Sequence, residues 1–312
     1  MLNKLPGLQQ AFWRFFLNPA SLSPFVFLRI SFAIFAIALW ITLYPSFQLL
    51  FGKEGYVEWF ISDMFFSNTA LPTLYKTLKF VNLVGAVSPL QFIHALYFMY
   101  GGCIVMIGVG LYANFFAFIA WLIHLVIFNT SVVYAYGVES IIHVLLFYFI
   151  FMPVDANCSL SSLFFKNYWE KRKAGAHIKA RIFLRVLQIH LCIIYLDAGL
   201  SKMFGTHWWN GEAVWRSLTQ FPFNPFNLTF LHNFPLLLQV TGWVVLAIET
   251  LYIFLVWNYK TRKFFLPCVI CMHAGIAFLV GLHFFGCIMI IMNISAFAFN
   301  NEISEVNTSS RL

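Results

Sequence analysis

The sequence predicts an all-α membrane protein, a bundle of about eight transmembrane helices with shorter interfacial helices. Of its 312 residues, 61% are hydrophobic and only 10% are charged. A soluble domain is about 45–50% apolar and about 25% charged. The apolar residues also gather in several runs, most of them close to the length of about 20 residues that a helix needs to cross a membrane.

The N-terminal residues 1–24 are expected to form an amphipathic segment that lies on the membrane surface. Phe12, Trp13 and Phe16 would face the lipid, and Arg14 would face the headgroups. No compact apolar stretch is followed by a small-residue cleavage site there, so we expect no cleavable signal peptide.

Eight apolar runs follow, and we treat 25–300 as a single transmembrane domain. The predicted spans cover about 25–50, 91–110, 115–128, 141–152, 182–203, 235–257, 264–280 and 283–299. Between the first two, the charged residues of 51–90 indicate an extramembrane segment with short interfacial helices. The polar tail 301–312 is expected to be disordered.

The distribution of basic residues predicts the orientation. Eight spans put both termini on one side, together with the basic loops 166–185 and 260–263. The positive-inside rule makes that side cytoplasmic. It also explains the net charge of +8, so membrane lipids are the expected partners and nucleic acid is not.

Residues 195–213, YLDAGLSKMFGTHWWNGEA, stand out because they bring Asp197 and Lys202 to the end of an apolar span. Ionisable groups inside a membrane are candidates for function, although a lysine near the end of a span can also extend to the headgroups. In a low-dielectric, aromatic site the charged form of Lys202 is disfavoured, and the neutral amine can act as a general base. If Asp197 or Glu212 pairs with it instead, Lys202 stays charged and its role is structural.

Further polar side chains in the apolar runs must pair, become neutral or line water. They are His94, His124, Glu139, His143, His190, Glu249, His273 and His283. Glu139 and His143 are four residues apart and share one helix face. No H-E-x-x-H motif and no second C-x-x-C pair accompanies Cys268 and Cys271, so no metal site is expected.

The sequence around Lys202 resembles a motif of the HTTM family, which includes the vitamin K-dependent γ-glutamyl carboxylase. That motif reads Y-x-x-x-G-x-x-K-[LM], a short gap, and W-x-x-G. The matching residues are Tyr195, Gly199, Lys202, Met203, Trp208 or Trp209, and Gly211. LRISFAIF around Arg29, LLFGKEGYVEWF and FYFIFMP look similar as well, so the likeness extends over about residues 20–300.

The resemblance implies a membrane enzyme with an extracytoplasmic active site. In the carboxylase a lysine deprotonates reduced vitamin K, and the product ultimately drives carboxylation of a glutamyl side chain. By motif position Lys202 corresponds to that base, and the cofactor is expected to be reduced vitamin K or another quinol, with no metal. The expected supporting or cofactor-binding residues are Asp197, Tyr195, Trp208, Trp209, Gly211, Glu212, His143 and Glu139.

The chain also departs from the animal carboxylase. Ser201 precedes Lys202 where that enzyme has paired lysines, and 130–140 contains no histidine. We also expect no large luminal domain after the spans. The substrate would then be a peptide or a small molecule. Two alternatives remain at this stage: a non-carboxylating member that assists maturation or export of a secreted peptide toxin, and a transporter or scaffold. In each case we expect an integral protein of a bacterial inner (plasma) membrane.

Overall fold

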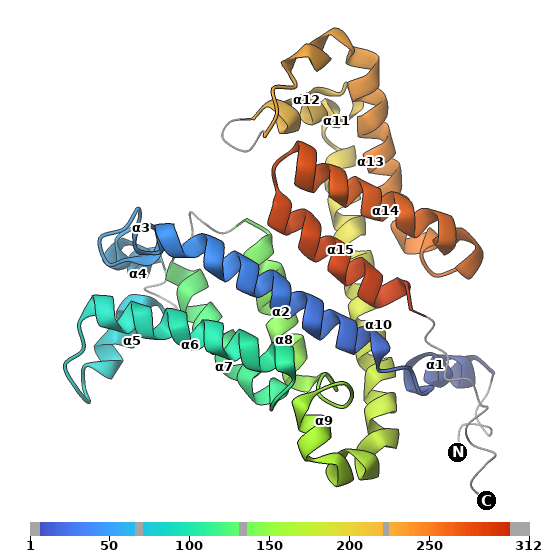
Figure 1. Ribbon diagram of the computed structural model, residues 1–312. Helices are drawn as coiled ribbons and strands as arrows, with labels where there is room; N and C mark the ends of the chain where they lie inside the picture. Colours follow the sequence, from blue (N-terminus) through green and yellow to red (C-terminus); the bar gives the residue numbers. More distant parts are fainter. Residues whose placement is uncertain (1–6, 66–70, 131–135, 221–224, 300–312) are drawn as a thin grey trace, which may run out of the picture. The chain divides into compact units, whose positions relative to one another are not determined.

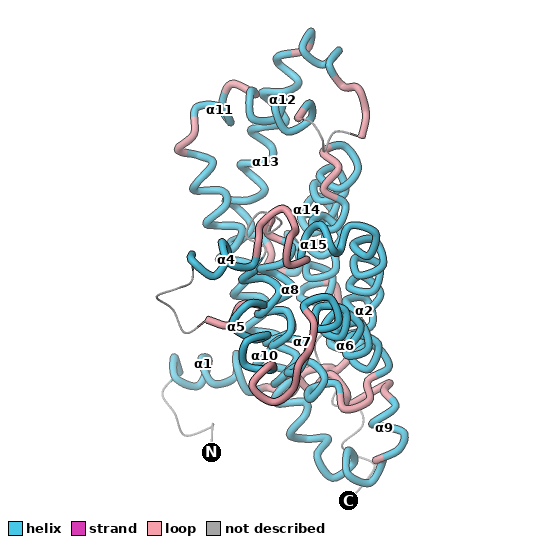
Figure 2. Tube along the Cα trace, turned by 90° about the vertical axis from the view of Figure 1, so that its left-hand side faces the viewer, coloured by secondary structure: helices cyan, strands magenta, loops and turns pink. Residues whose placement is uncertain are grey.

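The computed structural model describes residues 7–65, 71–130, 136–220 and 225–299. Within these ranges the protein is all-α, as predicted, and Figure 2 shows only helices and loops there. The α-helices (Figure 1) are α1 (Gly7–Leu17), α2 (Ser23–Leu43), α3 (Phe47–Phe51), α4 (Trp59–Phe65), α5 (Leu74–Val81), α6 (Pro89–Val109), α7 (Ala113–Thr130), α8 (Val138–Phe151), α9 (Leu160–Phe164), α10 (Lys166–Met203), α11 (Thr206–Trp209), α12 (Glu212–Thr219), α13 (Pro235–Leu255), α14 (Tyr259–Leu279) and α15 (His283–Phe297). Two 3₁₀ helices, η2 (Tyr44–Ser46) and η3 (Thr229–Asn233), occur in the same ranges.

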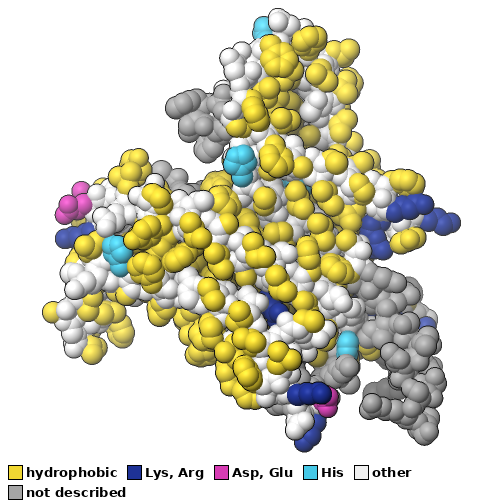
Figure 3. All heavy atoms as spheres, viewed as in Figure 1, with side chains coloured by type: hydrophobic (Ala, Val, Ile, Leu, Met, Phe, Trp, Pro, Cys, Tyr) yellow, Lys and Arg dark blue, Asp and Glu magenta, His cyan; other side chains and the backbone are white. Residues whose placement is uncertain are grey.

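In the described part of the chain, five helical stretches are long and apolar enough to cross a membrane, and the protein is therefore an integral membrane protein. These stretches are Ser23–Phe51, Pro89–Val109, Gly175–Met203, Pro235–Leu255 and Tyr259–Leu279. Shorter apolar stretches coincide with the remaining predicted spans: Ala113–Ile127, Val138–Phe151 and His283–Phe297. Hydrophobic side chains are spread widely over the face drawn in Figure 3.

Two predicted loops are wrong, because the basic residues in them are helical. α10 begins at Lys166, so residues 166–185 are helical and run into the fifth predicted span without a break. α14 begins at Tyr259 and includes the basic residues of 260–263 in its first turns. Lysine, arginine and alanine favour the helix, so a run of basic residues does not mark where a helix ends.

The chain forms two compact units, Phe25–Ala180 and a second made of Met1–Pro24 with Arg181–Leu312. The expected single transmembrane domain of 25–300 stays a prediction. The predicted disordered tail lies outside the described residues, as do the first six residues of the N-terminal segment.

In the unit Phe25–Ala180, α6 packs against α7 and α7 against α8. α2 joins them through Trp40, whose ring stacks on Tyr97 at a centroid distance of 5.1 Å. The indole N–H of Trp40 donates to the Tyr97 carbonyl at 3.1 Å, and the Tyr97 hydroxyl donates to the Trp40 carbonyl. Gly101 makes room for this ring, because a Cβ there would lie 2.7 Å from it.

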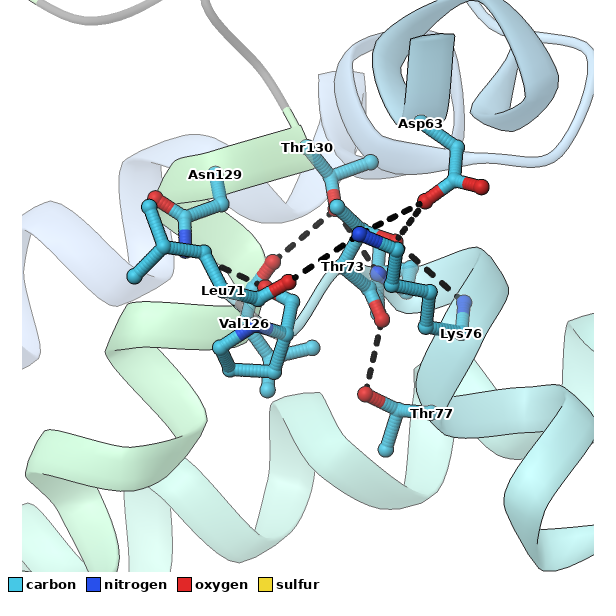
Figure 4. Close-up of polar contacts among 10 residues, drawn as sticks. Asp63, Leu71, Thr73, Lys76, Thr77, Val126, Asn129 and Thr130 are labelled. Atoms are coloured by element: carbon cyan, nitrogen blue, oxygen red, sulfur yellow. Dashed lines mark hydrogen bonds and ion pairs between the residues drawn. The ribbon is translucent and has the colours of Figure 1, made fainter. Parts of the chain in front are cut away.

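The short helices α4 and α5 are held to the C-terminal end of α7 by the polar contacts drawn in Figure 4. The Thr130 hydroxyl accepts a hydrogen bond from the Leu74 backbone N–H at 2.9 Å. Asp63 accepts one from the Thr73 hydroxyl at 3.0 Å and lies 3.5 Å from the Lys76 ammonium. The short helices predicted within 51–90 are thus confirmed.

A buried arginine fixes the loop that follows α8. Arg29 of α2 is 1% exposed, and its guanidinium donates to the Val154 carbonyl at 2.7 Å and the Cys158 carbonyl at 2.5 Å. Gly110 allows this approach, since it has a φ of 72° and a Cβ there would lie 2.4 Å from the guanidinium. Asp155 of the same loop is buried at 5% exposure.

Burial raises the pKa of Asp155 above its ordinary value of 3.8, although backbone N–H groups and the Arg29 guanidinium act in the opposite direction. An acid whose pKa rises on folding stabilises the protein below its unfolded-state pKa. That contribution is lost as the pH rises through the folded-state pKa. We expect the unfolding temperature to fall as the pH rises from about 4, and Asp155→Asn to flatten this part of the profile. Equal slopes for both proteins in thermal unfolding from pH 4 to 7 would contradict the expectation.

In the other unit, α14 and α15 form a tightly packed hairpin and α13 contacts α14. The end of α1 is held by two arginines of α10. Arg185 donates to the Phe15 carbonyl at 3.1 Å, and Arg181 donates to the Asn18 carbonyl at 2.6 Å. These contacts satisfy carbonyls that a helix C-terminus leaves unpaired.

Candidate functional site

Lys202 lies in the last turn of α10 and forms an ion pair with Glu249 of α13. The two side chains are 25% and 6% exposed. The Lys202 ammonium also lies 5.0 Å from the centroid of the Trp208 ring, a distance that allows a cation–π interaction. Lys202 is therefore held by a carboxylate and an aromatic ring at the edge of an apolar bundle.

The carboxylate partner differs from the two that the sequence suggested. Asp197 is exposed on α10, and among the described residues no hydrogen bond or ion pair joins it to Lys202. Glu212 instead accepts from Arg216 and lies 2.5 Å from the His207 Nδ1. The hydrogen bond with His207 has the larger effect and the one with Arg216 the smaller, and both lower the pKa of Glu212. Of the two alternative partners, Asp197 is exposed and Glu212 pairs with His207 and Arg216, so the carboxylate that pairs with Lys202 is Glu249.

The loop after α10 is fastened to α13 through its backbone. The Trp209 carbonyl accepts from the Gln239 side chain at 2.9 Å and from the Trp243 indole at 3.1 Å. Gly211 has a φ of 83° and lies so close to Gln239 that a Cβ would be 2.7 Å from its backbone nitrogen. These contacts place Trp208 over Lys202, whereas Trp209 is 46% exposed and donates to the Met203 carbonyl.

Gly199 brings α10 and α13 together at the ion pair. α10 continues as a helix through this glycine to Met203. A Cβ at Gly199 would lie 2.8 Å from the Thr250 methyl and 3.1 Å from the Glu249 Cβ. Its role is therefore close approach of the two helices, which lets Glu249 reach Lys202.

Gly199→Ala is expected to reduce the free energy of unfolding by about 1–3 kcal/mol, because the added methyl overpacks this contact. Gly102→Ala on α6 is the matched control, since nothing lies within 4 Å of a Cβ there. The control should gain about 0.5–1 kcal/mol from helix propensity. Thermal unfolding of both variants in one detergent checks this, and equal effects would refute the close-packing role of Gly199.

Tyr195, one of the predicted supporting residues, lies on the same helix as Lys202 and belongs to a buried network of hydrogen bonds. Its hydroxyl lies 2.6 Å from the His273 Nε2 and accepts from the Asn293 side chain at 2.8 Å. Asn293 in turn accepts from the Tyr252 hydroxyl at 2.7 Å. The Tyr195 and Tyr252 rings stack at a centroid distance of 3.9 Å.

Sequence reasoning found only part of this cluster. The sequence marks Glu249 and His273 as polar groups in apolar runs, but it does not show which residues they contact. Tyr252 and Asn293 were missed, because a tyrosine and an asparagine in a span carry no comparable signal. Glu249 is 47 residues from Lys202 in the sequence, and only the fold brings the two together.

Glu139 and His143, the two supporting residues predicted on one face of α8, lie in the other unit. The His143 Nδ1 is 3.3 Å from the His124 Nδ1, and the His143 ring stacks on Trp121 at 5.1 Å. Glu139 accepts from the Tyr136 backbone N–H at 3.0 Å. No three His, Cys, Asp or Glu side chains in the described ranges gather as a metal site requires.

An apolar cavity in this unit is bordered by both Glu139 and His124. It contains about 640 Å³ of space, part of it open to the surroundings. Its lining residues are Ala36, Leu39, Trp40, Leu43, Phe47, Phe51, Tyr97, Tyr100, His124, Ile127, Glu139 and Ile142. Apolar walls with a few polar groups are typical of small-molecule sites.

In comparisons with known proteins, no family model, no curated protein and no solved structure matches the chain.

Proposed function

We propose that the protein is a membrane-embedded enzyme that binds a quinol-type cofactor at Lys202 and removes a proton from it, in the manner of the vitamin K-dependent carboxylases. When bound, such a cofactor supplies a ring hydroxyl that can lose its proton and a ring that can then react with oxygen. The observation that carries the proposal is the ion pair of Lys202 with Glu249, covered by the Trp208 ring.

The side chains around Lys202 suit a flat molecule with a polar edge. Trp208 offers an aromatic wall, and the partly exposed Lys202 offers a polar group beside it. Within the described residues the buried Glu249 Oε2 has no hydrogen-bond partner. A buried oxygen of this kind costs free energy until a donor reaches it, and a ring hydroxyl is such a donor.

Glu249 also explains how a paired lysine can still act as a base. Transfer of a proton from the Lys202 ammonium to the Glu249 carboxylate converts two charges into two neutral groups. Low-dielectric surroundings tolerate neutral groups better than charged ones. The neutral Lys202 amine can then accept a proton from the bound quinol, while Glu249 holds the first proton close by.

The finer parts of the proposal rest on the sequence resemblance. The acceptor would be a peptide or a small molecule outside the cytoplasm, and reduced vitamin K is the first cofactor to test. The chain would lie in a bacterial inner membrane with both termini cytoplasmic.

Binding of a soluble naphthoquinol tests the proposal directly. Menadiol added anaerobically to the protein in lipid nanodiscs should quench tryptophan fluorescence with saturation. In Trp208→Leu most of the saturable quenching should disappear, whereas Trp121→Leu, in the other unit, should keep it. Quenching that rises linearly with menadiol, as in empty nanodiscs, would refute quinol binding.

A further inference from the structure

One backbone carbonyl fixes the direction of every hydrogen bond in the buried network of Tyr252, Asn293, Tyr195 and His273. The Asn293 Nδ2 donates to the Met289 carbonyl at 2.8 Å, and a carbonyl can only accept. The amide oxygen of Asn293 must therefore face Tyr252, whose hydroxyl donates to it. The second hydrogen on Nδ2 goes to the Tyr195 oxygen.

The proton of the Tyr195 hydroxyl then has one acceptor, the His273 Nε2 at 2.6 Å. A neutral imidazole that accepts at Nε2 carries its proton on Nδ1. The chain of hydrogen bonds thus fixes the tautomer of His273 and leaves its Nδ1–H as a donor. His273 is 3% exposed, and no described residue accepts from this Nδ1.

A second unsatisfied atom lies on the neighbouring helix. Glu249 of α13 is 5% exposed, and within the described part of the chain its Oε2 has no hydrogen-bond partner. α13 and α14 contact each other. Tyr195, which bonds to His273, and Gly199, which lies against Glu249, are four residues apart and share one face of α10. A buried donor and a buried acceptor therefore belong to the surroundings of Lys202.

We propose that His273 and Glu249 together bind one hydroxyl group, which accepts from the His273 Nδ1–H and donates to the Glu249 Oε2. A hydroxyl has both functions, whereas a ketone or an ether oxygen can only accept and an ammonium can only donate. The site selects alcohols and phenols, and Tyr195 is a positioning residue because it fixes the imidazole tautomer. This inference rests on the proposed function, and it names the group of the quinol that the Lys202 site recognises.

The two stacked tyrosines provide a matched pair of variants. Tyr195→Phe removes the donor to the His273 Nε2, so the imidazole can carry its proton on Nε2 and lose the Nδ1–H. Tyr252→Phe removes one hydroxyl from the same stack, but the Met289 carbonyl still fixes Asn293 and the tautomer is unchanged. Both tyrosines are buried, at 2% and 0% exposure, so the loss of packing is similar.

Menadiol and its dimethyl ether are the probes, because they share one ring system and only menadiol can donate a hydrogen bond. Tryptophan quenching in nanodiscs should show menadiol binding to the wild type about 10-fold or more tightly than the ether. Tyr195→Phe should weaken menadiol binding about 10-fold, because it removes the His273 Nδ1–H from which the hydroxyl oxygen accepts. Tyr252→Phe should change the binding of neither probe by more than about 3-fold.

Equal effects of the two variants on menadiol, or equal binding of menadiol and its ether by the wild type, would overturn the inference. In that case the His273 Nδ1 and the Glu249 Oε2 bind ordered water or have no hydrogen-bond partner. Menadiol binding that still depends on Trp208 would leave the proposed function standing, whereas the absence of any saturable binding would refute both.

Discussion

Replacing Lys202 with methionine is expected to reduce the free energy of unfolding by about 3 kcal/mol, because it leaves the carboxyl group of Glu249 without its partner in the protein interior. Glu249→Leu is expected to cost less, about 1–2 kcal/mol. The Lys202 side chain is a quarter exposed, so it can turn toward water or headgroups, whereas Glu249 is enclosed. Thermal or denaturant unfolding in one detergent measures the difference.

The double variant Lys202→Met/Glu249→Leu is the control, since replacing both members of a buried ion pair by apolar residues is often nearly neutral. We expect its stability to lie within about 1 kcal/mol of the wild type. Additive losses in the double variant would contradict a direct interaction between the two side chains.

The same double variant should lose function while keeping its fold. We expect menadiol-dependent oxygen uptake in nanodiscs to fall by about 10²–10⁴-fold, the usual contribution of a general base. Lys202→Arg keeps the positive charge but cannot give up its proton at physiological pH, and its activity should fall as far. Oxygen uptake that survives in the stable double variant would show that Lys202 is not the base.

The sequence was sufficient for the class of fold, because apolar runs of membrane-spanning length leave few other structures for the chain. It misplaced the starts of α10 and α14, since a basic helix and a basic loop have the same composition. Arg181 and Arg185 show a further limit: counted as loop charges in the orientation argument, they also hold the end of α1.

At the candidate site the sequence identified Lys202 and not its surroundings. An ionisable residue in an apolar run is visible from composition alone, but its partner is chosen by helix packing. Gly199 is an example, because its small size lets Glu249 approach, and no spacing along the chain reveals that. The tautomer of His273 depends on Asn293 and Tyr195, residues whose sequence positions give no hint of the contact.

The most direct measurement of the central claim, that Lys202 takes a proton from a bound quinol, is the absorption spectrum of menadiol on the protein under anaerobic conditions. Ionised and neutral menadiol absorb at different wavelengths. At a pH where free menadiol is neutral, the account predicts the spectrum of the ionised form on the wild type and of the neutral form on Lys202→Met/Glu249→Leu. A neutral spectrum on the saturated wild type, or identical spectra on the two proteins, would contradict it.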